Sequence, residues 1–257
     1  MKLEVMLSVM NLDKDNLDKM NITSKCTVIN QCERETFEKY KNFNIYSYEE
    51  LGLSNSRNRG LEHITEDIII LCDDDVIYSK DYEKNITQEF KDNPKADVIL
   101  FNIDSPNRKI KLNKRNKRLH IFNILRYTSC RIAFRKDAVL KYQIKFNTLF
   151  GAGAKYSNGE DSLFLVECLR KKIKIYSSKQ NIGMVNQISS TWFKGYNEKF
   201  FFDKGALFTA ISKKFKIFLL LQYLIRHRDN LDNIKFFKAF KIMLNGSKDY
   251  SNYMKTG

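Results

Sequence analysis

The chain has 257 residues, and its 45 Lys and Arg side chains outnumber the 30 Asp and Glu side chains, which gives a formal net charge of +15 at pH 7. A hydrophobic fraction of 43%, including aromatic residues at 13%, supplies enough apolar surface for a folded core and excludes an intrinsically disordered chain. Only 2 Pro and 10 Gly residues are present, which excludes collagen-like and low-complexity sequences.

Short apolar runs alternate with helical patterns along the chain. In chain order we expect a strand at Leu3–Met10, strands at Cys26–Asn30 and Phe43–Tyr46, a helix at Asn55–Ile64, a strand at Asp67–Leu71, a helix at Asp81–Asp92, a strand at Ala96–Asn102, a helix at Glu160–Lys171, a strand at Ile173–Ile175, and two helices at Ala206–Ile225 and Asn230–Leu244. Strands that alternate with helices form a mostly parallel sheet through right-handed crossovers. The sequence therefore predicts an α/β fold.

Polar side chains follow three of the expected strands. Asn11 follows the first strand, Asn30 ends the second, and Asp73, Asp74 and Asp75 follow the apolar run DIIIL, whose pattern is typical of a strand covered on both faces. Open α/β sheets bind ligands at the carboxyl ends of their strands. We therefore expect these residues to converge on one edge of the sheet.

Three consecutive aspartates repel one another unless a cation is present, and oxygen ligands favour Mg²⁺ or Mn²⁺. Alternate residues of an extended segment point the same way, so Asp73 and Asp75 are expected to share one task and Asp74 to have another. The alternative is an acidic turn at the surface.

Two further motifs carry charge at expected helix starts. Arg57 lies in the segment GLSNSRNRGL, where a helix start with a nearby Arg suits a phosphate. Glu160 and Asp161 open a helix after a Gly-bearing loop, and a carboxylate beside a reactive hydroxyl can act as a general base. Taken alone, each motif is more typical of an ordinary surface helix.

The order of GLSNSRNRGL, DIIIL-CDDD and GEDSLF resembles glycosyltransferase family 2, the inverting nucleotide-sugar transferases with the GT-A fold, from about Leu3 to about Lys174. The resemblance implies that Asp73 and Asp75 form a DxD motif that binds the divalent metal, Mn²⁺ or Mg²⁺, and the donor diphosphate and ribose. It implies that Asp161 of the ED motif is the general base, with Glu160 beside it. It further implies that the donor is bound by the DDD segment, including Asp74, and by Arg57, Asn11 and Asn30.

The chain departs from the family pattern at several positions. The second strand ends Asn30-Gln31, where an Asp is common, and none of His63, His120 and His227 matches a third metal ligand. The implied reaction is metal-dependent, inverting transfer of a sugar, with a UDP-sugar as the expected donor. The implied acceptor is a glycan hydroxyl, expected on a lipid-linked oligosaccharide in bacterial surface polysaccharide synthesis.

Two other functions remain open from the sequence. A nucleotidyltransferase also uses metal-binding carboxylates, but it would carry a Gly-rich, Lys-bearing loop after the first strand, and Ser8–Asp13 has no Gly. A nucleic-acid-binding protein could be built on the basic run Arg108–Arg118. A nucleic-acid-binding function would leave the DDD and GED motifs without a role, so we expect no nucleic-acid partner.

The net charge is concentrated in two segments. Ser105–Lys136 has 11 Lys and Arg and no Asp or Glu, and the part from Lys204 onward has 11 against 3, which leaves 23 against 27 for the rest. We expect a catalytic domain at 1–203 and basic amphipathic helices at 204–257. Aromatic groups beside lysines are typical of helices that lie on an anionic membrane, although helices packed on the catalytic domain would show the same pattern.

Cysteine usage and the N-terminus bear on the compartment. Five Cys residues without a CxxC motif favour reduced thiols, and the N-terminus does not resemble a signal peptide. The expected location is the cytoplasm, with peripheral binding at the inner face of the membrane.

Overall fold

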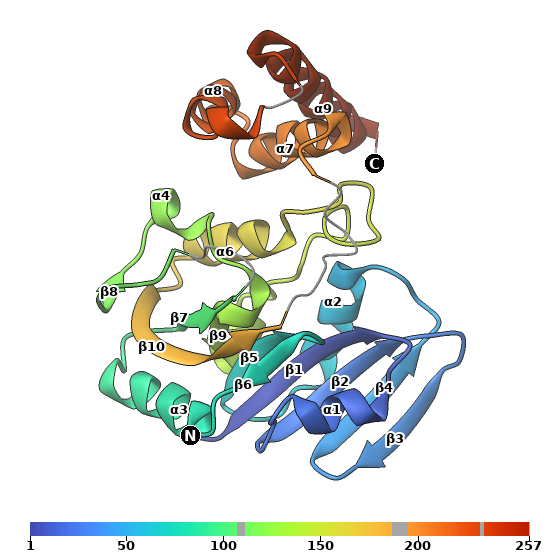
Figure 1. The fold of residues 1–257 in the computed structure, drawn as a ribbon, viewed down its shortest axis with the longest axis vertical. Helices are drawn as coiled ribbons and strands as arrows, with labels where there is room; N and C mark the ends of the chain where they lie inside the picture. The colour runs from blue at the N-terminus through green and yellow to red at the C-terminus, as the bar shows by residue number, and fades with distance from the viewer. Residues whose placement is uncertain (107–110, 187–194, 232–233, 257) are drawn as a thin grey trace.

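The computed structural model describes residues 1–106, 111–186, 195–231 and 234–256. Its described strands form a ten-stranded mixed sheet in the order β3-β4-β2-β1-β5-β9-β7-β10-β6, and β8 pairs with β10 (Figure 1). The strands are β1 (Leu3–Met10), β2 (Lys25–Gln31), β3 (Thr36–Tyr40), β4 (Phe43–Tyr48), β5 (Ile68–Asp73), β6 (Val76–Tyr78), β7 (Val98–Asp104), β8 (Lys117–Arg118), β9 (Ile132–Arg135) and β10 (Ile175–Val185). Parallel pairings involve more residues than antiparallel ones, which confirms the expected α/β fold.

Helices cover both faces of this sheet. The described helices are α1 (Lys14–Lys19), α2 (Leu53–His63), α3 (Tyr82–Asp92), α4 (Ile121–Ile124), α5 (Lys136–Lys141), α6 (Glu160–Arg170), α7 (Glu198–Ile211), α8 (Lys216–Arg226) and α9 (Phe236–Thr256), and a 3₁₀ turn, η1 (Ser129–Arg131), precedes β9. Two separate apolar clusters pack on the two faces. One includes side chains of α2 and α6, and the other includes side chains of α1 and α3.

The central strands contribute side chains to both clusters, because successive side chains of a strand point to opposite faces of the sheet. In β5, Ile69 and Leu71 join the cluster with α2 and α6, whereas Ile68 and Ile70 join the cluster with α1 and α3. All four side chains are fully buried. The apolar run DIIIL is therefore a strand covered on both faces, as its composition predicts.

The C-terminal helices form a layer of their own beyond α6 (Figure 1). The expectation of one helix over Ala206–Ile225 is wrong, because α7 ends at Ile211 and α8 begins at Lys216. Ser212 has extended backbone angles, and this break lets α8 turn so that Leu220 and Leu224 are buried against the cluster that holds α7. The division expected after residue 203 falls within α7.

The last helix also differs from the expected range. It begins at Phe236 and continues to Thr256, well past the expected end at Leu244. Gly246 is a buried position where α9 crosses α7. A Cβ atom at Gly246 would lie 1.9 Å from the carbonyl oxygen of Phe202 in α7.

Gly205 of α7 makes the reciprocal close approach. A Cβ atom there would lie 1.9 Å from the carbonyl oxygen of Met243 in α9. We expect Gly205→Ala to lower the free energy of unfolding by about 1–3 kcal/mol or more, because backbone atoms must separate to admit the methyl group. Urea unfolding measures this change. Asn245→Ala, an exposed position of α9, is the control, and an equal loss in both variants would contradict the packing argument.

Candidate active site

The acidic residues after β5 lie at the carboxyl edge of the parallel strands. Asp73 is the last residue of β5, and Asp74 and Asp75 form the turn that leads to β6. The backbone carbonyl of Asp75 accepts a hydrogen bond of 2.8 Å from the amide of Asn186. The expected alternation along one extended segment is therefore interrupted, because the strand ends at Asp73 and the chain turns.

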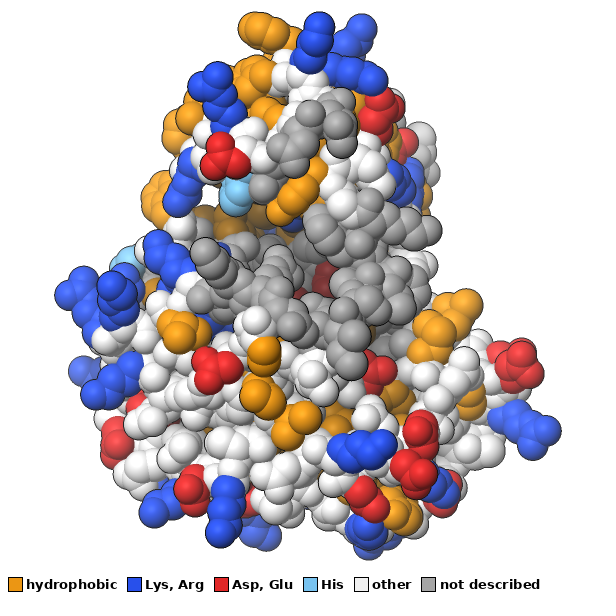
Figure 2. All heavy atoms as spheres, viewed as in Figure 1, with side chains coloured by type: hydrophobic (Ala, Val, Ile, Leu, Met, Phe, Trp, Pro, Cys, Tyr) orange, Lys and Arg blue, Asp and Glu red, His pale blue; other side chains and the backbone are white. Residues whose placement is uncertain are grey.

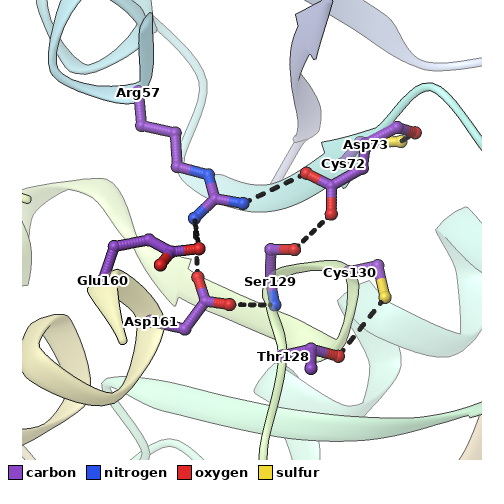
Figure 3. Close-up of polar contacts among 8 residues, drawn as sticks. All are labelled: Arg57, Cys72, Asp73, Thr128, Ser129, Cys130, Glu160 and Asp161. Carbon is purple, nitrogen blue, oxygen red and sulfur yellow. Dashed lines mark hydrogen bonds and ion pairs between the residues drawn. The ribbon is translucent and has the colours of Figure 1, made fainter. Parts of the chain in front are cut away.

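Arg57 of α2 joins the two acidic motifs. One terminal nitrogen of its guanidinium lies 2.6 Å from Asp161 Oδ1 and 3.5 Å from Glu160 Oε1, and the other lies 3.1 Å from Asp73 Oδ1 (Figure 3). The Arg57 side chain is only 2% exposed, and its guanidinium lies over the Phe146 ring at 5.4 Å. The structure thus brings together residues that are separated by about a hundred positions in the chain.

Ser129 of η1 is a second link between the same carboxylates. Its hydroxyl donates a hydrogen bond to Asp73 Oδ2, and its backbone amide donates one of 2.9 Å to Asp161 Oδ2 (Figure 3). Sequence reasoning missed Ser129, since it lies in a basic segment with no recognisable motif. The short apolar run IAFR that follows it, Ile132–Arg135, was the available sign that the chain re-enters the sheet there.

Burial and charge set the ionisation of this group. Burial raises the pKa of Asp161 to about 7; the Arg57 guanidinium opposes that shift, and the charges of Glu160 and Asp73 add to it. Burial lowers the pKa of Arg57, but the three carboxylates outweigh burial and hold that pKa above its ordinary value. Arg57 is therefore a permanent cation, and Asp161 is a carboxyl group that can exchange a proton near neutral pH.

Glu160 lies beside Asp161 in the first turn of α6 and is 8% exposed. Its Oε2 atom is buried and has no hydrogen-bond partner among the described residues. A buried carboxylate oxygen without a partner is costly, so a donor from a bound molecule would stabilise it.

Asp75 and Asp74 lack the cationic partner that Asp73 has. Among the described residues, no Lys or Arg forms an ion pair with either side chain. Burial, and then the charges of Asp73 and Asp74, raise the pKa of Asp75 to about 6. A hard divalent cation would relieve this repulsion, so the donor set of carboxylate oxygens fits Mg²⁺ or Mn²⁺.

A complete protein cage for the metal is absent from the described part of the chain. No group of three or more His, Cys, Asp or Glu side chains there is arranged to hold an ion. His63 stacks on Tyr46 at 3.8 Å, and His227 lies 4.4 Å from the Tyr223 ring. The remaining ligands would come from phosphate and water, as is usual where Mg²⁺ is bound with a substrate.

The two asparagines expected at the nucleotide base lie at the ends of β1 and β2. Asn30 is buried, and its side chain accepts a hydrogen bond from the amide of Leu12 at 2.9 Å and donates one to Ser47 Oγ at 3.1 Å. Asn11 is exposed and has a left-handed backbone with φ of 51°. Asn30 thus holds the turn that presents Asn11 at this edge.

Comparisons with known proteins bear on the family of the chain. The family model for glycosyl transferase family 2 matches residues 29–157, which is half of the chain. No curated protein sequence matches the chain. This match favours a glycosyltransferase over the nucleotidyltransferase and nucleic-acid-binding alternatives.

Solved structures with the same fold cover nearly the whole chain. S. aureus TarS 1–349 in complex with UDP-GlcNAc superposes with a TM-score of 0.68 at 16% identity, over 97% of this chain and 80% of TarS 1–349. The mannosyltransferase PcManGT from Pyrobaculum calidifontis in complex with GDP-Man and Mn²⁺ superposes with a TM-score of 0.55 at 12% identity, over 98% of this chain and 75% of PcManGT. The chain belongs to glycosyl transferase family 2, and it is a glycosyltransferase with the GT-A fold.

Proposed function

We propose that the enzyme transfers a sugar from a nucleotide-diphosphate sugar to a hydroxyl of a glycan acceptor, with a divalent metal and with inversion at the anomeric carbon. The observation that carries the proposal is the position of Arg57 between Asp73 of the DDD segment and Asp161 of the ED motif. The carboxylates proposed to bind the donor and to accept the proton are thus held by the same side chain.

Asp161 is the proposed general base. Ser129 and Arg57 each hold one of its carboxylate oxygens, which fixes the plane of the group. Its raised pKa suits a base that takes a proton from an acceptor hydroxyl as that hydroxyl attacks the sugar. The Oε2 atom of Glu160, which has no hydrogen-bond partner among the described residues, is proposed to accept a hydrogen bond from the same acceptor.

The donor is proposed to bind along the DDD segment, with Asn11 and Asn30 at the nucleotide base, Asp74 at the donor, and Arg57 supporting the nucleotide through Asp73. Asp73 and Asp75 would hold Mn²⁺ or Mg²⁺, and the metal would stabilise the negative charge of the leaving diphosphate. The TarS complexes with UDP-GlcNAc and UDP support a UDP-sugar donor, and PcManGT with GDP-Man and Mn²⁺ supports the use of a metal.

A metal-dependent hydrolysis assay tests the proposed function without the acceptor. We expect the protein to hydrolyse UDP-GlcNAc or another nucleotide sugar slowly in the presence of Mn²⁺, and we expect EDTA to abolish the reaction. Asp75→Asn should remove the metal dependence and most of the activity, because it removes a charged oxygen ligand. Release of nucleoside diphosphate is the measurement.

Asp81→Asn is the matched control. Asp81 is exposed, and its side chain makes no capping hydrogen bond at α3, so the same acid-to-amide change should leave turnover unaltered. Activity that survives EDTA, or that survives in Asp75→Asn, would contradict metal dependence. Binding of none of the UDP, GDP and CMP sugars in a thermal-shift panel would contradict the proposed donor class.

The acceptor is proposed to be a lipid-linked oligosaccharide at the inner face of a membrane in bacterial surface polysaccharide synthesis. None of the helices in the described ranges has the length and apolar character that a membrane span requires. Exposed apolar side chains instead occur at and just before α8 and at the start of α9, and we name them together the α8 surface; they are Phe215, Ile217, Phe218, Ile225 and Phe237. Basic residues stand among these side chains, and Figure 2 shows apolar and basic groups together on this end of the molecule.

Phospholipid vesicles test the α8 surface. Apolar side chains beside lysines bind at the interface of an anionic bilayer, so we expect co-sedimentation with phosphatidylglycerol vesicles at low salt and release at high salt. Phe218→Ser should weaken binding, whereas Phe37→Ser, which changes a similarly exposed Phe of β3, should not (57% and 60% exposed). Equal binding by both variants, or no binding by the unaltered protein, would reject the membrane proposal.

A further inference from the structure

The loop that precedes α6 lies between α2 and the C-terminal helices. On the α2 side, the amide of Leu53 donates a hydrogen bond of 3.0 Å to the carbonyl of Ala152, and Ser54 Oγ donates one of 2.6 Å to the carbonyl of Phe150. The loop therefore connects the helix that carries Arg57 with the helix that carries Asp161. Its other side faces α7 and α9.

Asp203 of α7 holds this loop through a fully buried carboxylate. Its Oδ2 atom accepts hydrogen bonds from the amide of Ser157 at 3.0 Å and from the Ser157 hydroxyl at 2.5 Å. Its Oδ1 atom is paired with Lys199, whose ammonium also donates a hydrogen bond of 2.8 Å to the carbonyl of Lys155. Ser157 is four residues before Asp161 in the chain.

Joining two segments through a buried carboxylate has a high cost in free energy. Removing a charge from water costs several kcal/mol, and a well-packed apolar residue often stabilises a protein equally well. Asp203 is nevertheless 0% exposed, and the groups that satisfy it are mainly those of the loop. What an apolar side chain could not provide is a fixed position for the Ser157 backbone.

The other C-terminal helix, α9, holds the preceding residues of the same loop. Asp249 accepts a hydrogen bond of 2.7 Å from the Tyr156 hydroxyl and lies 2.8 Å from the Lys155 ammonium. At the end of the loop, Gly159 has a φ of 114°, and a Cβ atom there would lie 2.6 Å from Leu207 of α7. Contacts from α7 thus reach the residue that directly precedes Glu160.

We propose that Asp203 is a positioning residue for the general base: it fixes the Ser157 backbone and thereby the start of α6, where Asp161 meets Arg57 and Ser129. The proposal rests on the proposed function of Asp161. The proposal implies that α7 and α9 help to position an active-site residue. This role is separate from any contact that α8 makes with a membrane. The role is distinct from donor binding, because no contact of Asp203 reaches the DDD segment among those described.

Asp203→Asn is the direct test, with Glu198→Gln as the matched control on the same helix. Glu198 is exposed and pairs only with the exposed Lys238 among the described residues, so the control makes the same acid-to-amide change away from the loop. We expect kcat for nucleotide-sugar turnover with Mn²⁺ to fall by about 10- to 100-fold in Asp203→Asn, since a misplacement of about 1 Å has effects of this size. The KM for the donor should not change in Asp203→Asn. The melting temperature should not change in the control, Glu198→Gln.

Hydrogen exchange supplies a readout that does not depend on activity. The Ser157 amide and its neighbours in the loop should exchange faster in Asp203→Asn than in the unaltered protein, while amides of β1 and β5 should not. Unchanged loop exchange in Asp203→Asn would overturn the proposal. Faster loop exchange with unchanged kcat would also overturn it, because the loop would then not position the base.

Ser157→Ala covers the case in which Asp203→Asn fails to fold. It removes one of the two hydrogen bonds from Ser157 and should lower kcat by a smaller factor, and in the double variant the two effects should not multiply. Independent, multiplicative effects on kcat would overturn the proposal. If the unaltered protein turns over no nucleotide sugar, the proposed function fails, and loop exchange alone then decides whether Asp203 orders the segment before α6.

Discussion

Replacing Asp161 by Asn is expected to lower kcat for sugar transfer by about 10²- to 10⁴-fold, the usual contribution of a general base. The amide keeps the shape of the side chain and can still accept the hydrogen bond from the Ser129 amide, but it cannot take a proton from the acceptor. Donor binding should be retained, because Asp161 lies on the α6 side of Arg57 and the DDD segment lies on the other. Calorimetry with UDP and Mn²⁺ measures that binding.

The pH profile identifies the base more specifically than the loss of rate. Burial raises the pKa of Asp161 to about 7, and a base must be ionised to act, so the rate of the unaltered enzyme should fall as the pH drops below about 7. The residual activity of Asp161→Asn should lack this decline. Asp137→Asn, the same change at an exposed first-turn position of α5, should retain both the rate and the profile. Normal turnover in Asp161→Asn would contradict the assignment.

Arg57→Met is expected to have the largest effect on stability, a loss of about 3–5 kcal/mol in the free energy of unfolding. The guanidinium is buried within reach of Asp73, Glu160 and Asp161, and its removal leaves three neighbouring carboxylates without a cation. Arg57→Lys should recover part of the loss, because it restores the charge but not two separate donors directed at two motifs. Urea unfolding at pH 7 is the measurement.

Arg59→Met is the matched control for Arg57→Met. Arg59 lies two residues further along α2, is 41% exposed and pairs with Glu50 and Glu62 at the surface. Surface ion pairs contribute at most about 1 kcal/mol, so the loss should be correspondingly small. Similar losses in the two variants would show that the buried network does not depend on Arg57.

The strands that present the site were predictable because local patterns specify them. The expected strand Leu3–Met10 has the bounds of β1, and the expected helix Glu160–Lys171 differs from α6 by one residue. Both have a clear apolar period and a marked start. The run IAFR of β9 is a weaker sign, because four residues carry little pattern and the pairing partners, β5 and β7, are distant in the chain.

The members of the site were predictable in kind, but their contacts were not. Paired carboxylates after a buried strand and at a helix start indicate metal and base chemistry, and their proposed roles still await the experiments above. That one arginine joins them depends on where the fold places α2 relative to α6, which no local pattern encodes. The role of Ser129 was unpredictable for the same reason, because it comes from two contacts that exist only in the folded molecule.

Charge patterning also overstated the free positive charge of the segment Ser105–Lys136. Arg131 is 1% exposed and donates hydrogen bonds to the carbonyl of Phe101 and the side chain of Asn102. Arg135 donates to the backbone carbonyls of Ala96 and Phe90. These two arginines stabilise the fold, and Arg108, at the start of the basic run, lies outside the described residues.

The place of β9 in the sheet ties the assembly of the active site to the completion of the fold. This strand stands between β5 and β7 and so joins the N-terminal half of the sheet to the half that holds β7 and β10. Because it runs antiparallel to β5, its start lies beside the end of β5, and Ser129 arrives there together with it (Figure 3). A molecule in which β9 is not seated has neither a continuous sheet nor the Ser129 contacts that hold Asp73 and Asp161, so we expect turnover to report on the fraction of chains that have finished folding.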